Sequence, residues 1–301
     1  MKQIAILSGK GGSGKTSICA ALIDLISQNH SLSMVDADVD AANLNLLIPC
    51  TEQTEQSFQG GKKAIIAQES CIRCGICLKY CRFHAVHRTL DDSGLNPRFS
   101  IDLLACEGCA VCAQQCPSSA ISMHPTQDGV WYRSSSEYGE CFHAHLFAGH
   151  ENSGKLVSTI ISAARRYVQN SAVDLILVDG PPGIGCPVIA VCNQSDLALI
   201  VTEPTPSGIH DMQRILDTIR YFDLPAFLII NKFDLHLQNT EQILEQCERE
   251  DVPVLGQIPF DPQFNEAILH AQPITRYATD SLSNQAIHAI WQQLKSQVLN
   301  S

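Results

Sequence analysis

The sequence has few basic residues: 20 Lys and Arg stand against 31 Asp and Glu, and the formal net charge is −11. A protein that holds nucleic acid on a broad surface needs the opposite balance, so nucleic acid is not an expected partner. No window of about eighteen uninterrupted apolar residues occurs, which argues against a membrane span. No basic segment with an apolar run behind it follows Met1, and we therefore expect a cytoplasmic protein.

Cysteine, by contrast, is abundant, with 14 residues in a chain of 301. In a cytosolic protein of this length, so many cysteines fit metal ligands better than a disulfide framework. Eight of them lie between Cys71 and Cys116. The other six are scattered, namely Cys19, Cys50, Cys141, Cys186, Cys192 and Cys247. A scattered cysteine is most often a small buried apolar residue.

Short apolar strands alternate with helical segments along most of the chain. "QIAILSG" and "LSMVDAD" are typical of strands, and "TSICAALIDLISQ" between them has helical spacing. This alternation predicts an α/β fold, a mostly parallel sheet with helices on both faces. Residues 58–126 contain the cysteine cluster and interrupt the pattern. We therefore predict a discontinuous domain at 1–57 and 127–301 with a small α+β domain inserted at 58–126.

The segment "GKGGSGKT", Gly9 to Thr16, matches the phosphate-binding pattern G-x-x-x-x-G-K-[ST] between a strand and a helix. Glycine permits a close backbone approach, and the N–H groups at the helix start then point at phosphate oxygens. In this P-loop pattern Lys15 reaches the β- and γ-phosphates, and the hydroxyl of Thr16 binds Mg²⁺. The predicted nucleotide-binding residues of the loop are Gly9, Lys10, Gly11, Gly12, Ser13, Gly14, Lys15, Thr16 and Ser17.

Lys10 is a second lysine ahead of the glycines in "KGGSGKT". The segment resembles the deviant Walker A ATPases, the family of MinD, ParA, Mrp-type carriers and the nitrogenase iron protein. The resemblance covers essentially the whole chain and implies an ATP-dependent homodimer in which Lys10 reaches the phosphates of the partner subunit. An exposed loop lysine without such a role is the alternative.

Three further segments resemble that family. In "VDADVDAANLN" the resemblance implies that Asp38 positions the attacking water and that Asp36 lies near Mg²⁺. In "LILVDGPPG" it implies that Asp179 contacts the ligands of Mg²⁺ rather than the ion itself, and that Gly183 lies near the γ-phosphate. "INKFD" occupies the base-recognition position, so Asn231 is expected to hydrogen-bond adenine; the letters also resemble the guanine-reading N-K-x-D of GTPases, and the early lysine favours ATP. The predicted catalytic residues are Lys10, Lys15, Asp38 and Asp179.

The clustered cysteines form two runs with C-x2-C-x2-C-x3-C spacing, Cys71, Cys74, Cys77, Cys81 and Cys106, Cys109, Cys112, Cys116. This is the pattern of bacterial two-cluster ferredoxins, in which the fourth cysteine of a run ligates the other cluster. The resemblance implies one 4Fe–4S cluster on Cys71, Cys74, Cys77 and Cys116, and a second on Cys106, Cys109, Cys112 and Cys81. A zinc site normally uses two cysteine pairs around one ion, which fits two crowded quartets poorly.

Two residues near these motifs carry open alternatives. Arg82 follows the first run where the second run has Pro117, so its charge either raises a cluster potential or points into solvent. Cys186 lies seven residues after Asp179, at the offset where the nitrogenase iron protein has the ligand of a dimer-bridging cluster. That resemblance implies a candidate third cluster at Cys186. Such a cluster needs a second cysteine from each subunit, and Cys141 is the one plausible mate in the sequence, since Cys192 is expected on the same helix, facing inward. A buried or redox-sensing thiol is the favoured alternative.

Three functions are compatible with these motifs. ATP-gated electron transfer to a partner redox protein is favoured, because complete cysteine quartets indicate stably bound clusters. The alternatives are an iron–sulfur cluster carrier or scaffold of Mrp type that delivers to a partner, and a positioning ATPase whose clusters sense redox state. Mrp-type carriers use a sparse C-x-x-C for a shared cluster, and none occurs outside 58–126.

Overall fold

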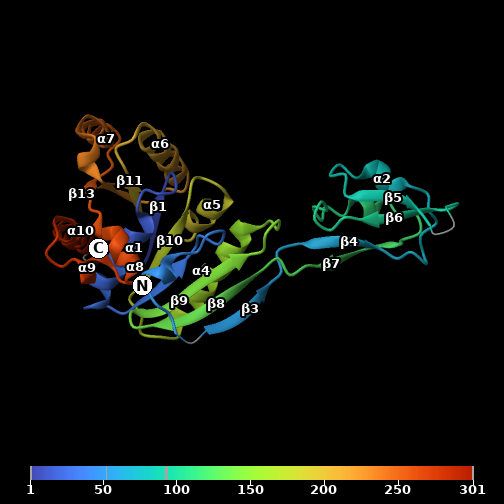
Figure 1. Ribbon diagram of the computed structural model, residues 1–301, viewed down its shortest axis with the longest axis horizontal. Helices are drawn as coiled ribbons and strands as arrows, with labels where there is room; N and C mark the ends of the chain where they lie inside the picture. Colours follow the sequence, from blue (N-terminus) through green and yellow to red (C-terminus); the bar gives the residue numbers. More distant parts are fainter. Residues whose placement is uncertain (1, 52, 92–93, 300–301) are drawn as a thin grey trace. The chain divides into compact units, whose positions relative to one another are not determined.

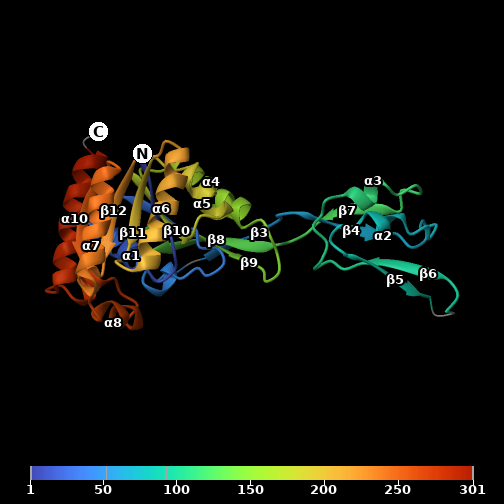
Figure 2. The same cartoon turned by 90° about the horizontal axis from the view of Figure 1, so that it is seen from above.

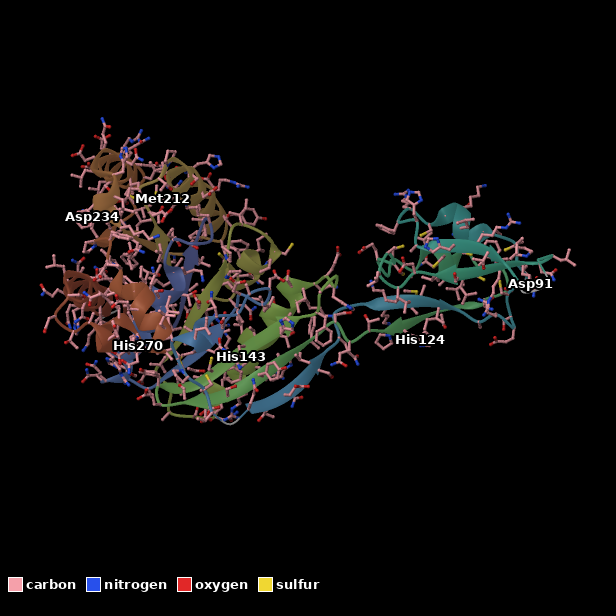
Figure 3. All side chains as sticks on the ribbon, in the orientation of Figure 1. Asp91, His124, His143, Met212, Asp234 and His270 are labelled. Carbon is pink, nitrogen blue, oxygen red and sulfur yellow. The ribbon has the colours of Figure 1, made fainter. Side chains whose placement is uncertain are left out.

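A computed structural model describes residues 2–51, 53–91 and 94–299, and the chain divides into two compact units. The larger unit consists of Met1–Gln56, Trp131–His145 and Ser153–Ser301. The smaller unit consists of Ser57–Val130 and Leu146–Asn152. Figure 3 places Asp91 and His124 in the smaller unit and Met212 in the larger.

The larger unit is built on a nine-stranded sheet with the order β13-β12-β11-β1-β10-β2-β9-β8-β3 (Figure 1). β1 pairs in parallel with β10 and β11, β2 with β10 and β9, and β12 with β11 and β13. The prediction of a mostly parallel sheet is therefore confirmed. The strands are β1 Lys2–Ser8, β2 Leu32–Asp36, β3 Gln53–Phe58, β8 Gly129–Ser136, β9 Gly139–Leu146, β10 Leu175–Pro182, β11 Leu197–Thr202, β12 Ala226–Asn231 and β13 Val254–Ile258.

Helices cover both faces of this sheet (Figures 1 and 2). Ile4 and Ile6 of β1 pack into one apolar core with Leu22 and Trp291, all at most 4% exposed. Central strands such as β1 are buried on both faces, which is why they read as continuous apolar runs. The helices are α1 Lys15–Ser27, α4 Ser153–Gln169, α5 Cys186–Cys192, α6 Pro206–Tyr221, α7 Leu237–Arg249, α8 Gln263–Leu269, α9 Ile274–Tyr277 and α10 Leu282–Leu299.

The smaller unit contains two antiparallel strand pairs and two short helices. β4 (Lys62–Ile66) pairs with β7 (Ile121–Pro125), and β5 (Val86–Leu90) pairs with β6 (Pro97–Ile101). α2 (Ile76–Tyr80) and α3 (Val111–Gln114) pack against each other. Their small core contains Ile66 and Phe99 together with cysteines of both runs.

The boundaries of this unit differ from the expected 58–126, because Ser57 and residues 127–130 and 146–152 belong to it as well. Buried Asp128 explains the difference. Its carboxylate accepts the N–H of Gly61 at 2.7 Å and pairs with Nδ1 of His150 at 2.8 Å. Its backbone bonds to Phe58 and Phe147, so one residue ties three chain segments together.

Within the described residues, no helix is both long enough and apolar enough to cross a membrane.

Candidate functional site

The predicted phosphate loop joins the end of β1 to the start of α1. Gly12 and Gly14 have left-handed backbones, with φ of 83° and 87°. A Cβ on Gly14 would lie 2.3 Å from Nδ2 of Asn231, so no larger residue fits there. The loop borders a cleft of about 400 Å³, a volume suited to a small ligand. Every predicted loop residue from Lys10 to Ser17 lines this cleft.

Lys15 and Thr16, which line the cleft, both contact the buried carboxylate of Asp179. Nζ of Lys15 lies 2.6 Å from Oδ1 of Asp179, and the hydroxyl of Thr16 donates to Oδ2 at 2.7 Å. Burial alone would lower the pKa of Lys15, but the attraction of Asp179 outweighs it and the pKa is raised. The predicted phosphate lysine, Mg²⁺ ligand and strand-end acid are therefore in direct contact.

Two further acids follow β2. Buried Asp36 accepts the backbone N–H of Asp38 at 3.1 Å and those of Asn43 and Leu44 at 3.0 Å. Burial, and next the nearby Asp179, raises the pKa of Asp36 to about 7. The carboxylate of Asp36 thus fixes the turn that contains Asp38. The position of Asp36 near Mg²⁺ stays a prediction. Asp38 itself is half-buried and lines the cleft.

Lys10 is held by contacts within its own chain. Nζ of Lys10 lies 2.7 Å from Oε1 of Glu203 and donates at 3.0 Å to the hydroxyls of Thr205 and Ser207. The hydroxyl of Thr205 also caps α6 by accepting the N–H of Gly208. These contacts fix the position of the Lys10 side chain, and the residues next to Lys10 in the sequence do not predict its partners.

Residues 231 and 232 support the phosphate loop from the end of β12. The Asn231 amide donates to the Ser13 carbonyl at 2.8 Å and accepts the N–H of Lys232 at 3.0 Å. Nζ of Lys232 donates to the Gly12 carbonyl at 3.0 Å and pairs with Glu203 at 2.9 Å. Asn231 thus contacts the loop backbone, and its hydrogen bond to adenine stays a prediction.

Replacing Asn231 by alanine is expected to destabilise the larger unit by about 1–3 kcal/mol, because the buried Ser13 carbonyl loses its partner. Urea unfolding followed by tryptophan fluorescence measures this, since Trp131 and Trp291 both lie in the larger unit. Asn193→Ala is the control at an exposed position, with an expected change within about 0.5 kcal/mol. Equal midpoints for the two variants would contradict a supporting role for Asn231.

The residues of the opposite wall of the cleft are not predicted by the sequence motifs. This wall follows β13 and includes Pro259, Phe260, Asp261, Phe264 and Ile268. The available signal was the aromatic segment "IPFDPQF", which begins at the last residue of β13, at the edge of the sheet where the phosphate loop begins. Apolar and aromatic side chains commonly line the base-binding part of such clefts.

The cysteines of the smaller unit surround two separate hollows. The first hollow is lined by Cys71, Cys74, Cys77 and Cys116, and the second by Cys81, Cys106, Cys109 and Cys112. This is the crossed grouping that the ferredoxin resemblance implies. Among the described residues, no three His, Cys, Asp or Glu side chains are placed to hold a single metal ion. Each quartet instead faces a hollow, and four thiolates are the donor set that an iron–sulfur cluster requires.

The two runs also share one backbone conformation. Arg73 and Gly108 occupy the same position of their runs and have φ of 62° and 64°. Gly75 and Ala110, two positions later, have φ of 74° and 63°. A left-handed backbone is costly for arginine and alanine, and such strain concentrates at functional sites. The repeated conformation supports the same wrapping of both loops around a bound group.

Cys186 and Cys141 do not form the pair expected of a bridging cluster. Cys186 is exposed at the start of α5, whereas Cys141 is 2% exposed inside the core. Cys141 shares a hydrogen bond with Cys50, and burial further raises its pKa well above the usual range. The proposal of Cys141 as a ligand is therefore corrected: a core thiol cannot reach a cluster shared between surfaces. Cys19, Cys192 and Cys247 are buried, as expected, and Cys50 is half-buried.

The sheet order, the phosphate loop and the acids at the strand ends define a P-loop nucleotide-binding ATPase. Residues 4–274 match the family described as CbiA, the CobQ/CobB/MinD/ParA nucleotide-binding domain, and the chain belongs to this family.

Relatives and solved structures agree with this membership. An uncharacterized protein of Methanocaldococcus jannaschii is 31% identical, covering 97% of this chain and 96% of its own. A Pyrococcus furiosus protein named iron–sulfur cluster carrier protein is 22% identical, covering 91% of this chain and 79% of its own. The fold is similar to that of MinD from Pyrococcus horikoshii, solved with Mg-ADP, with a TM-score of 0.60 at 17% identity, covering 98% and 96% of the two chains.

Proposed function

We propose that this ATPase is a homodimeric iron–sulfur protein whose ATP cycle controls the delivery of a cluster to a partner protein. The observation that carries the proposal is the pair of hollows, each lined by one complete cysteine quartet. Relatives named iron–sulfur cluster carrier proteins support delivery over the other roles. In this proposal residues 58–126 form a ferredoxin-like domain within the smaller unit.

The nucleotide steps follow from residues around the cleft. ATP phosphates would compete with Asp179 for Lys15, because both are anions that seek the same buried ammonium. The hydroxyl of Thr16 would bind Mg²⁺, and the carboxylates of Asp36 and Asp179 would lie near the ion. The ion would offset the negative charge of the phosphates. Asp38 lines the cleft and would hold the attacking water in position for the γ-phosphate.

Dimer formation would require Lys10 to leave its own chain. In the single chain Lys10 is bound to Glu203 with a side chain 27% exposed, so it is accessible but restrained. A partner subunit's phosphate would replace Glu203 as the anion beside this lysine. Nucleotide binding and dimer formation are thereby coupled through one ion pair.

Glu203→Gln is therefore expected to promote dimerisation. The amide keeps the shape of the side chain but removes the charge that pairs with Lys10 and, on the same carboxylate, with Lys232. A partly exposed pair contributes up to about 1 kcal/mol, so half-maximal dimerisation should need roughly three- to fivefold less ATP. Analytical ultracentrifugation across an ATP series measures this, with Lys10→Ala as the control that should not dimerise. A higher ATP requirement for Glu203→Gln would contradict the restraint.

Electron transfer is the second candidate, and a specific observation favours it. Both quartets lie in one small unit, and α2 and α3, which contribute cysteines to them, pack together. Adjacent bound clusters supply either iron and sulfide for delivery or one-electron redox chemistry, and complete quartets suit tight retention. The relatives favour the first use and the quartets favour the second.

Incubating the iron-loaded protein with an apo-ferredoxin separates the two candidates. Delivery predicts that iron moves to the apo-protein, faster with ATP than with ADP, and that a Lys15→Ala variant loses the ATP effect. Iron that stays on the chain while a holo-ferredoxin acceptor becomes reduced would reject delivery in favour of electron transfer. An iron chelator in a parallel sample distinguishes direct transfer from release into solution.

A further inference from the structure

We propose that the smaller unit docks an acidic protein through the surface around its first cysteine run. This surface, called here the basic face, consists of Ile72, Arg73, Lys79, Tyr80, Arg82 and Phe83. The inference rests on the proposed function, because the docked protein is the one that receives the cluster or the electron.

The charge of the basic face is unusual for this chain. From Ser70 to Leu90 the sequence contains four Lys or Arg residues and no Asp or Glu, although the whole chain carries −11. Arg73, Lys79 and Arg82 are exposed, and none of the three makes an ion pair with a described residue. Exposed cations that lie close together in the chain and have no ion pair favour an acidic partner and steer it during encounter.

The second cysteine run provides an internal control for this argument. Arg73, Lys79 and Arg82 correspond by position to Gly108, Gln114 and Pro117 of the second run. The two loops share their left-handed positions, so holding a bound group does not require the cations. Arg73 even carries its charge at a left-handed position where the second run has glycine, a conformation that is costly for a residue with a Cβ. The loop conformation therefore does not account for the charge.

The apolar part of the basic face shows the same asymmetry. Ile72 is 63% exposed, Tyr80 47% and Phe83 44%. Their counterparts in the second run are Glu107, Gln115 and Ser118, all polar. Ile72 lines the first hollow, and Tyr80 and Phe83 line the second, so the apolar side chains border both hollows. Aromatic residues and arginine are the side chains most enriched in protein interfaces, which favours a protein over a small anion.

Yellow sulfur atoms lie among the side chains of the smaller unit in Figure 3. Cys74 and Cys109 are the exposed members of the two quartets. A partner seated on the basic face would come close to Cys74, since Arg73 adjoins it in the chain. Docking would also cover the exposed rims of the hollows and exclude water there.

Binding of the iron-loaded protein to two probes tests the proposal. An immobilised plant-type ferredoxin supplies an acidic surface, and immobilised cytochrome c supplies a basic one. We expect measurable binding to the ferredoxin at 50 mM salt, weakened about tenfold at 300 mM, and weaker binding to cytochrome c. Binding that is independent of salt, or stronger to cytochrome c, would overturn the proposal.

Two variants locate the interaction. Lys79→Glu/Arg82→Glu should weaken ferredoxin binding about tenfold or more, because like charges now face each other. Arg73→Gly removes a charge while keeping the left-handed backbone, so it should weaken binding about threefold without disturbing the loop. Arg166→Glu/Arg249→Glu, on exposed positions of the larger unit, makes the same change in net charge and should bind as the unmodified protein does.

Four outcomes separate this inference from the proposed function. Full iron content in the basic-face variants establishes that their loops are intact. Normal ferredoxin binding by those iron-loaded variants would reject the basic face while leaving the proposed function standing. Failure of the unmodified protein to bind iron would reject the proposed function itself. Salt-sensitive self-association that the basic-face variants lose would replace the acidic partner by a second copy of this chain, and would also overturn the inference.

Discussion

Replacing Lys15 by alanine is expected to abolish ATP binding and to destabilise the larger unit at the same time. Lys15 and Asp179 have side chains 7% and 0% exposed, and their charged atoms are 2.6 Å apart. Removing one partner of such a pair leaves the other as an uncompensated buried charge, at a cost of about 3–5 kcal/mol. Calorimetric titration with ATP and urea unfolding followed by tryptophan fluorescence measure the two losses.

The double variant Lys15→Ala/Asp179→Ala is the matched control. It removes both charges, so most of the stability should return, while ATP binding stays absent because no ammonium meets the phosphates. This difference separates the structural from the functional role of Lys15. A single variant that retains both ATP affinity and stability would show that the buried pair has neither role.

The second large effect concerns the crossed cysteine quartets. Cys81 belongs in sequence to the first run but lines the second hollow with Cys106, Cys109 and Cys112. A Cys81→Ala/Cys109→Ala variant should therefore lose one cluster and retain about four iron atoms per chain. Cys81→Ala/Cys74→Ala removes ligands from both hollows and should bind almost no iron in stable form.

The two double variants serve as controls for each other, because each removes two cysteines from the same small unit. Ligation within each run would give the opposite result: the pair Cys74 and Cys81 would then belong to one cluster. Iron analysis after anaerobic purification distinguishes the two patterns. Equal iron loss in both variants would reject the crossed grouping.

The central part of the fold was predictable from local patterns. Strands such as β1 and β10 are continuous apolar runs, because a central parallel strand is buried on both faces. The order of glycines and lysines in the phosphate loop is specific to phosphate-binding loops, so the motif alone locates the loop in the sequence. The resemblance of the cysteine runs to two-cluster ferredoxins likewise implies the grouping of the cysteines around the two hollows.

The edge of the sheet was not predictable in this way. Five of the six residues of β3, Gln53 to Ser57, are polar and exposed, and Thr54 lies among them. An edge strand is identified by its pairing with distant residues and has little apolar signal of its own. β8 and β9 lie between β3 and β2 in the sheet order, and the alternation of strands and helices along the chain does not predict them.

The parts of the site that sequence reasoning missed depend on long-range contacts. Lys10 meets Glu203, which is 193 positions away, and Asn231 meets Ser13 across 218 positions. Nothing in the letters around either residue indicates its partner. The sequence offers Cys141 as a ligand of a bridging cluster, but its place on β9 beside β2 buries it in the core.

The relatives also change the order of the candidate functions. Complete quartets made electron transfer the leading interpretation of the sequence, whereas proteins named iron–sulfur cluster carriers match most of the chain. The two candidates share the same nucleotide chemistry and the same quartets. They differ in whether the bound iron leaves the chain, which the transfer experiment above measures.

The most direct test of the account is the iron and acid-labile sulfide content of the anaerobically purified chain. Two 4Fe–4S clusters predict about eight iron atoms and about eight sulfide ions per chain. Loss of both on replacing Cys74 and Cys109 by alanine would assign them to the quartets. Zinc without iron, or iron that survives that replacement unchanged, would contradict the central claim.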